Sequence, residues 1–313
     1  MSKRKTTTTV AIIATAVALT ATACGSGSKD SGGKKDVKLG FAISALNQPF
    51  MVEMKNGAEA EAKAQGADLS VQNASDDASQ QANQVQNFTS QQVKSIIINP
   101  VDSDAAAPSV KAAGNAKIPV IAADRSVNKA KVEATVASDN VEGGRMAAKE
   151  INDQLGGKGE ILVLQGQVGT SASRERGKGF KEGLKKYPGI KVVSKQPADF
   201  QRAKGLDVTT NALQSHPNLD AVFAENDEMA LGAAKALGAK AGGDVKIVGF
   251  DGTPEALKAV KKGTLTSTVA QQPAELGKMA VRNAMRVVEG STVDPQIKVP
   301  VKVVTKKNVD RFS

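Results

Sequence analysis

The sequence predicts an α/β protein with two lobes, each built on a parallel sheet. Between residues 221 and 254 the chain twice repeats a short apolar run, a polar turn and a helix-prone segment, the pattern of a buried parallel sheet. The same alternation starts at Val37, and after Asp139 the series begins again. Repeated strand–helix units of this length imply parallel sheets with right-handed crossovers, so we expect two lobes with a break near 138–140.

In the first half, strand-like runs alternate with helix-like segments across short polar turns. The expected strands are 37–43, 68–72, 95–98, 120–123 and 132–137, and the expected helices are 49–65, 79–91 and 105–113. Four to five strands in each half is close to the usual size of one sheet.

The second half repeats the pattern, beginning with a helix over 141–155 whose apolar residues Val141, Met146, Ile151 and Leu155 suit one face. The further strands are expected at 161–164, 192–194, 221–224 and 245–250, and the further helices at 173–186, 202–214, 229–237 and 255–260.

Residues 1–23 are interpreted as a secretory signal peptide that is no part of the fold. Lys3, Arg4 and Lys5 form a basic start, and 10–22 is a run of small and apolar residues, too short for a stable membrane span. The Gly- and Ser-rich segment up to residue 36 predicts a flexible tether.

Cys24 follows the apolar run at the distance found in bacterial lipoprotein signals, which this stretch resembles; Ala21 departs from the more usual Leu. We expect Cys24 to carry lipid, so that 24–36 anchors the folded part to the outer face of the cell membrane. The alternative is that Cys24 is incidental. As the chain's only cysteine, it excludes an intrachain disulfide.

The net charge of +10 is no signature of nucleic-acid binding. Without Lys3, Arg4 and Lys5, 39 basic and 32 acidic residues remain, a net charge of +7. The basic residues are spread along helix faces without interleaved aromatic side chains, so we expect no nucleic-acid partner.

Polar residues follow several apolar strands at the point where each strand ends. Asn226 and Asp251 end the two units between 221 and 254, and Asp124 and Arg125 follow the strand at 120–123. Ligands of open parallel sheets gather beyond the carboxyl ends of the strands. A local ion pair together with a helix cap would explain a single strand end with such residues. Three strand ends that carry Asp or Asn favour a shared polar pocket.

The segment 166–176 superficially suggests a phosphate loop, because it has glycines and opens a helix. The Gly-Lys-Ser/Thr ending of a P-loop is missing. Thr170, Ser171 or Ser173 is better interpreted as a helix cap. Arg174 and Arg176 cannot both point the same way, so at most one of them faces a cleft.

No catalytic arrangement emerges, and we expect neither a metal nor a cofactor. His216 is the only histidine and lies in a polar turn, and the sole cysteine is Cys24, so a zinc site or a Cys/His nucleophile is not indicated. Carboxylates and arginines instead make charge-assisted hydrogen bonds to hydroxyl groups, and aromatic faces cover the C–H side of a sugar ring.

Seven ordered motifs carry a resemblance to one family. They are 45–50 (ALNQPF), 98–105 (INPVDSDA), 137–140 (ASDN), 169–177 (GTSASRERG), 196–200 (QPADF), 226–232 (NDEMALG) and 249–254 (GFDGTP). The chain resembles the ribose-binding family of periplasmic binding proteins over about 37–304. The resemblance implies the type I fold, with two Rossmann-like lobes that close on a monosaccharide about a three-segment hinge, and delivery of the sugar to an ABC permease.

The resemblance also implies which residues act. The implied ligand contacts are Ser44, Gln48, Phe50, Met51, Asp124, Arg125, Arg176, Phe200, Asn226, Asp251 and Gln271. The implied hinge residues are Ser138, Asp139, Gln271, Gln272, Lys302 and Val303. The implied lobes are 37–138 with 272–302 and 139–271 with 303–313, and we expect the protein to act as a monomer.

Gln48 and Met51 depart from the family pattern, which has Asn and a second Phe there, so ribose competes with another pentose or hexose as the ligand. Sugar-responsive repressors share the fold, but an N-terminal helix-turn-helix has no counterpart here. A secreted sugar-acting enzyme would need a catalytic carboxylate pair. Asp124 and Asp251 are the candidates, but we expect Arg125 and Arg176 to hold both ionised, and therefore no enzyme.

Overall fold

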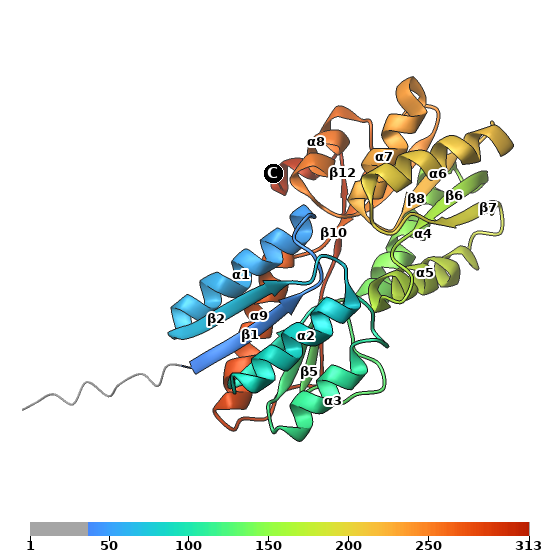
Figure 1. Cartoon of the computed structure of the whole chain (residues 1–313). Coiled ribbons are helices and arrows are strands. Elements are labelled where there is room, and N and C mark those ends of the chain that lie inside the picture. The colour runs from blue at the N-terminus through green and yellow to red at the C-terminus, as the bar shows by residue number, and fades with distance from the viewer. Residues whose placement is uncertain (1–36, 313) are drawn as a thin grey trace, which may run out of the picture. The chain divides into compact units, whose positions relative to one another are not determined.

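The computed structural model describes residues 37–312. This part of the chain contains two six-stranded sheets flanked by helices (Figure 1). The predicted signal peptide 1–23, the predicted lipid-bearing Cys24 and the tether 24–36 lie outside the described residues. Among residues 37–312, no helix is long and apolar enough to cross a membrane.

The first lobe is built on a parallel sheet with the strand order β11-β5-β4-β3-β1-β2. Its strands are β1 (Val37–Ile43), β2 (Ala67–Asn73), β3 (Ser95–Ile98), β4 (Val120–Ala123), β5 (Ala134–Ser138) and β11 (Gln296–Val299). Its helices are α1 (Pro49–Gln65), α2 (Ala78–Ser90), α3 (Ala107–Asn115) and α9 (Pro273–Val288).

Helices cover both faces of the first sheet, and strand alternation supplies each face with apolar side chains. Phe41 and Ile43 lie in the core beneath α1 and α9, with Met54 of α1. Ala42, between them in β1, faces the opposite core, where it meets Phe88 of α2. Burial on both faces explains why β1 has a nearly continuous apolar sequence.

The second lobe has the strand order β12-β10-β9-β8-β6-β7, and only the β10–β12 pair is antiparallel. Its strands are β6 (Gly159–Gln165), β7 (Ile190–Pro197), β8 (Ala221–Ala224), β9 (Lys246–Asp251), β10 (Ser267–Ala270) and β12 (Lys302–Thr305). Its helices are α4 (Asn140–Leu155), α5 (Ser171–Leu184), α6 (Arg202–Ser215), α7 (Asp227–Leu237) and α8 (Pro254–Lys262), with 3₁₀ turns at Gly238–Lys240 and Val309–Arg311.

Each face of the second sheet also has its own core. On the side of α4 and α5, the rings of Phe180 and Phe223 stack with their centroids 4.3 Å apart. Leu162 and Leu164 belong to the other core, with Met229 of α7. Two separately packed lobes can therefore hold a polar cavity between them without weakening either core.

The described chain passes between the lobes at 138–140, at 270–273 and at 299–302. Hydrogen bonds tie these passages together: the Asp139 amide donates to the Val299 carbonyl (3.0 Å), and Gln272 Nε2 donates to the Pro300 carbonyl (3.0 Å). One predicted boundary is wrong. Lys302 pairs with Ala270 in the second sheet, because β11 ends before Pro300, which has no amide hydrogen to continue a ladder.

Five elements, namely β1, α1, β3, β4 and β8, have the bounds expected from sequence, and the other expected bounds shift by one to three residues. Two helices begin two residues earlier than expected, because a different residue caps each of them. Thr170 accepts a hydrogen bond from the Ser173 amide, so Thr170 is the cap and α5 begins at Ser171. Asn226 accepts from the Met229 amide, so α7 begins at Asp227.

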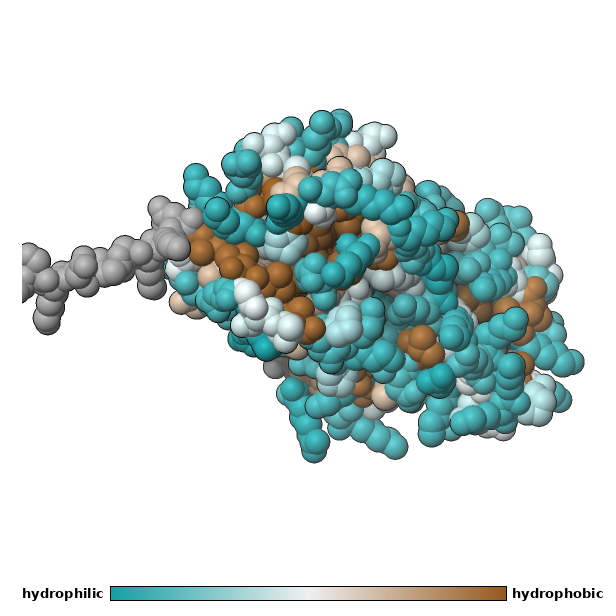
Figure 2. Space-filling view, turned by 90° about the horizontal axis from the view of Figure 1, so that it is seen from below, coloured by the Kyte–Doolittle hydropathy of each residue, from teal (hydrophilic) through white to brown (hydrophobic). Residues whose placement is uncertain are grey.

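The face shown in Figure 2 is mostly hydrophilic, with smaller hydrophobic areas between the polar side chains. Among residues 37–312, the large apolar side chains that are exposed are Val52, Val168, Val192 and Phe312, which come from four different segments. Single exposed apolar side chains of this kind are normal for a soluble fold.

Candidate functional site

A small cavity lies between the two lobes. The residues that line it are Gln48, Phe50, Met51, Asp124, Arg125, Ala172, Arg176, Phe200, Asn226, Asp251 and Gln271. The structure therefore brings together every expected ligand contact except Ser44, and it adds Ala172.

Strand ends position the polar half of this cavity. Asp124 and Arg125 follow β4 directly, Asn226 follows β8, Asp251 ends β9 and Gln271 follows β10. Strands β8, β9 and β10 are neighbours and run parallel, so their carboxyl ends meet at one edge of the second sheet. The expectation that Asn226 and Asp251 lie at one crevice is confirmed by the cavity they share.

Asp124 is held in place from behind by a chain of hydrogen bonds. Asn99 Nδ2 donates to Asp124 Oδ2 (3.1 Å), and Ser44 Oγ donates to Asn99 Oδ1 (2.6 Å). Asp124 has a φ of 65°, the left-handed region that Asp and Asn tolerate better than most residues. Ser44 is fully buried and does not line the cavity. Its hydroxyl orients Asn99, which gives Ser44 a positioning role, and its expected ligand contact stays a prediction.

Arg176 is the buried cation of the second lobe. Its Nε donates to Asn140 Oδ1 (2.9 Å), and its Nη1 donates to the Glu225 carbonyl (2.6 Å) and lies 3.6 Å from Asp251 Oδ1. The guanidinium carbon lies 3.9 Å from the centroid of the Phe250 ring. Arg174 is exposed and bonds the Gly169 carbonyl, so only one of these two arginines faces the cavity, as the helix geometry predicted.

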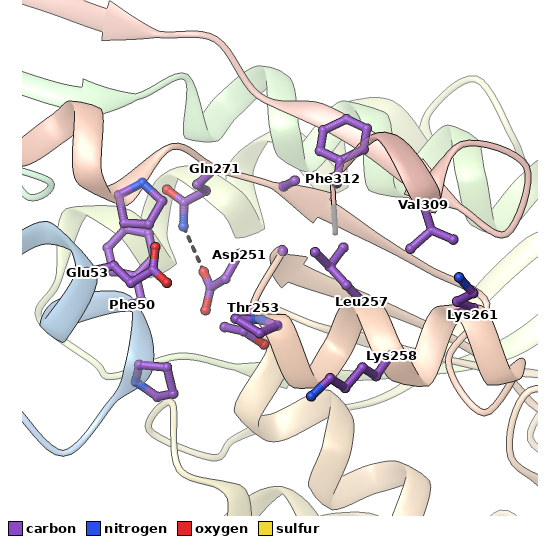
Figure 3. A pocket seen from close by; sticks show the side chains of 15 residues that line it. Phe50, Glu53, Asp251, Thr253, Leu257, Lys258, Lys261, Gln271, Val309 and Phe312 are labelled. Carbon is purple, nitrogen blue, oxygen red and sulfur yellow. Dashed lines mark hydrogen bonds between the residues drawn. The ribbon is translucent and has the colours of Figure 1, made fainter. Parts of the chain in front are cut away.

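Asp251 has an unusual backbone. Its φ of 131° lies in a region normally reserved for glycine, at a cost of roughly 1–3 kcal/mol. Gln271 Nε2 donates to Asp251 Oδ1 (2.7 Å), a bond drawn as a dashed line in Figure 3. The strain is maintained by the surrounding sheet, and it brings the Asp251 carboxylate to the cavity wall.

Burial decides the direction in which the pKa values of the two cavity carboxyls shift. It raises the pKa of Asp124 above its usual range, and the pull of Arg125 and Arg176 offsets this only in part. It raises the pKa of Asp251 well above its ordinary value, against the attraction of Arg176 and with repulsion from Asp227 adding to the rise. Desolvation therefore outweighs the arginines in setting the direction of both pKa shifts, while the expectation that both carboxyls are ionised stays a prediction.

Two phenylalanines form the apolar part of the wall. Phe200 lies beneath both arginines, with guanidinium carbons 5.6 Å (Arg125) and 5.7 Å (Arg176) from its centroid. Its ring fits only because residue 166 is glycine: a Cβ there would lie 2.0 Å from Phe200 Cζ. Phe50 comes from α1 of the other lobe, so the cavity receives one aromatic side chain from each lobe.

Three buried polar atoms of the cavity have no hydrogen-bond partner: Asp124 Oδ1, Arg125 Nε and Gln271 Oε1. Two are acceptors and one is a donor, on both sides of the cavity. Buried polar groups are almost always paired in folded proteins. A ligand rich in hydroxyl groups, which both donate and accept, would satisfy all three.

A second and larger cavity, of about 440 Å³, adjoins the first on the side of α8 (Figure 3). Phe50, Asp251 and Gln271 line both cavities. The remaining wall includes Leu257 of α8 and Phe312. Among residues 37–312, no cluster of three or more His, Cys, Asp or Glu side chains offers a metal site.

Comparison with known proteins fixes the family. Residues 39–292 match the model of the periplasmic binding protein domain. This chain is a member of that family. It is 45% identical to the ribose import binding protein of Bacillus subtilis (strain 168) over 278 residues, which is 89% of this chain and 90% of that protein.

Solved structures of other periplasmic binding proteins share its fold. An ABC transporter solute-binding protein from Bacillus halodurans C-125 with bound myo-inositol has a TM-score of 0.85 and 34% identity, over 90% of this chain and 99% of the other. One from Actinobacillus succinogenes 130z with bound D-allose has a TM-score of 0.82 and 32% identity, over 88% and 99%. The family and the two-lobed α/β fold expected from sequence are confirmed.

Sequence reasoning missed three residues of this periplasmic binding protein that hold its cavity in shape. Asn99 donates a hydrogen bond to Asp124, and Asn140 and the Glu225 carbonyl accept hydrogen bonds from Arg176. Glu225 also accepts from the Gly166 amide (2.7 Å) and from Ser173 Oγ (2.5 Å), which fixes the loop before α5. Asn99 follows β3, the neighbour of β4, so the strand-end rule applied to 124 and 125 would have found it.

Proposed function

We propose that this periplasmic binding protein binds one neutral monosaccharide in the cavity between its lobes. The three unpartnered polar atoms, Asp124 Oδ1, Arg125 Nε and Gln271 Oε1, carry the proposal. A sugar hydroxyl can accept from Arg125 and donate to Asp124 or Gln271 at once, and hydrogen bonds to charged groups are the stronger ones. The ring of Phe200 supports the apolar face of such a sugar.

The balance of charge in the cavity favours a neutral ligand. Two carboxyl groups, Asp124 and Asp251, lie among two guanidinium groups, Arg125 and Arg176. A sugar acid or a sugar phosphate would add a buried negative charge without a cation to pair with it, which is costly.

Ribose is the monosaccharide that we propose first, with another pentose or hexose as the alternative. The support is the 45% identity to a ribose import binding protein over most of both chains. Gln48 and Met51, which line the cavity at the positions where the family pattern differs, are the residues through which another sugar would be selected.

Calorimetric titration of the purified protein tests this proposal, with D-ribose, other pentoses, hexoses and polyols as neutral ligands and gluconate and ribose 5-phosphate as charged controls. We expect a neutral aldose to bind with one site per chain and to raise the unfolding temperature, because a ligand of the folded form alone stabilises it. The proposal would be contradicted if no neutral sugar gave a heat of binding, or if the charged controls bound more strongly than the neutral sugars.

We further propose that the sugar closes the two lobes and that the closed form is what an ABC permease receives. Three adjacent passages between the lobes, at 138–140, 270–273 and 299–302, support a hinge there. Because Asp124 comes from the first lobe and Asp251 from the second, a sugar that bonds both stabilises the closed form alone. The protein acts as a monomer in this scheme.

The sugar is released unchanged in this proposal, since the family consists of binding components of transport systems. Chromatography of ribose after long incubation with the protein tests for turnover, and any product that forms only in the presence of the protein would contradict simple binding.

We also propose export and lipid attachment at Cys24. Incorporation of labelled palmitate that is lost in Cys24→Ala would support that attachment, and equal labelling of both would contradict it.

A further inference from the structure

Three loops, two from the first lobe and one from the second, meet directly beside the sugar cavity. The loop after β3 contributes Ser103, and the loop after β4 contributes Ser126, both from the first lobe. The loop after β6 contributes Gly169 and leads into Ser171, the first residue of α5, in the second lobe. None of these residues lines the cavity.

Three hydrogen bonds join these loops across the lobe boundary. The Ser103 amide donates to the Gly169 carbonyl (3.1 Å), and the Ser171 amide donates to Ser103 Oγ (3.2 Å). The Ser126 amide donates to Ser171 Oγ (2.8 Å). The hydroxyls of Ser103 and Ser171 thus each accept from a backbone amide of the other lobe. Ser103 is fully buried and Ser171 is 4% exposed, so the bonds are shielded from water.

Close approach at this point depends on a glycine. Gly169 has a φ of 94°, and a Cβ on it would lie 1.9 Å from Asp102 Oδ2 of the first lobe. Asp102 cannot easily withdraw, because its Oδ1 accepts from the amides of Asp104 (2.8 Å) and Ala105 (2.7 Å). A side chain at 169 would therefore obstruct the lobes only when they are together.

We propose that Ser103, Ser126, Gly169 and Ser171 form a latch that holds the closed lobes together without touching the sugar and thereby sets the affinity for every ligand. This inference rests on the proposed closure of the lobes about a sugar. The apparent dissociation constant equals the intrinsic one divided by the fraction of protein in the competent closed state. Weakening the latch lowers that fraction by the same factor whichever sugar binds.

The first test compares wild type with Ser171→Ala by calorimetry on ribose and on the two next-best sugars of the panel. Loss of one net hydrogen bond corresponds to about fivefold weaker binding. We expect all three affinities to fall by one common factor of this size, so that their ratios stay as in wild type. Unchanged affinities would overturn the latch. Unequal losses would also overturn it, by assigning Ser171 to the sugar site.

The second test uses Gly169→Ala with Gly263→Ala as its matched control. Gly263 has a similar φ of 88° but nothing within 4 Å of an added Cβ, so it experiences the backbone strain without the lobe contact. We expect both variants to lose similar thermal stability without sugar, and only Gly169→Ala to lose affinity. Equal affinities would overturn the latch. Absence of sugar binding by wild type would instead refute the proposed function.

Discussion

Asp124→Asn is the substitution that probes the cavity most selectively, because it removes a charge and keeps the shape. The residue has a φ of 65°, which Asn tolerates as well as Asp does, so the backbone should be unaffected. The new amide oxygen can still accept from Asn99 Nδ2, which leaves an NH₂ group where the unpartnered Oδ1 stands. An acceptor for a sugar hydroxyl therefore becomes a donor.

The magnitude follows from the bond that is lost. A hydrogen bond to a charged group contributes about 1.5–3 kcal/mol, which corresponds to roughly 10- to 150-fold in the dissociation constant. Stability without sugar should change little or rise, because burial raises the pKa of Asp124 and so disfavours the charge that the substitution removes.

Calorimetry on ribose and thermal unfolding without ribose together measure both effects. Asp199→Asn is the matched control, because Asp199 also has a positive φ (51°) but does not line the cavity. We expect the control to bind like wild type. An Asp124→Asn protein that is stable and binds ribose within twofold of wild type would refute the assignment of Asp124 to the ligand.

Three other substitutions test separate parts of the account. Phe200→Ala should weaken sugar binding in calorimetry, because the ring lines the cavity, and it should also cost up to about 3–5 kcal/mol in chemical denaturation, because the same ring packs in the core of the second lobe; normal affinity in this variant would show that Phe200 has a structural role alone. Met51→Phe should change selectivity among sugars more than stability, since a flexible thioether adapts its shape to a ligand better than a rigid ring does. Equal shifts in affinity for every sugar would count against this. Burial raises the pKa of Asp227 to about 6, so the native state binds protons more readily than the unfolded one, and the free energy of unfolding should fall by up to about 3 kcal/mol between about pH 4 and pH 6. Asp227→Asn should reduce that slope in denaturation curves across this range, while Asp124 and Asp251, whose pKa values burial also raises, still contribute to it. A slope as steep as that of wild type would be contrary to this assignment.

Sequence patterns were sufficient where one rule governs many residues. Apolar runs bounded by polar turns located strands such as β8, and the carboxyl-end rule then brought Asn226 and Asp251 to one cavity. These inferences need only strand periodicity and parallel pairing, which depend little on distant contacts.

Properties that depend on packing between distant segments could not be predicted. The role of Ser44 is set by Asn99, 55 residues away, and that of Arg176 by Asn140 and the Glu225 carbonyl. The direction of the pKa shift of Asp124 could not be predicted, because an ion pair is visible in the sequence and desolvation is not. The lobe boundary was predicted one residue too late, after Lys302, because strand β12 was not predicted from the sequence.

Small-angle X-ray scattering with and without saturating D-ribose tests the central claim, that the two lobes close over a neutral monosaccharide. The account predicts a smaller radius of gyration with ribose, and no change with ribose 5-phosphate, which the charge balance of the cavity should exclude. The scattering of the ribose complex should match the profile calculated from the structure described here. An unchanged radius of gyration at a ribose concentration where calorimetry shows saturation would contradict hinge closure and indicate a rigid pocket.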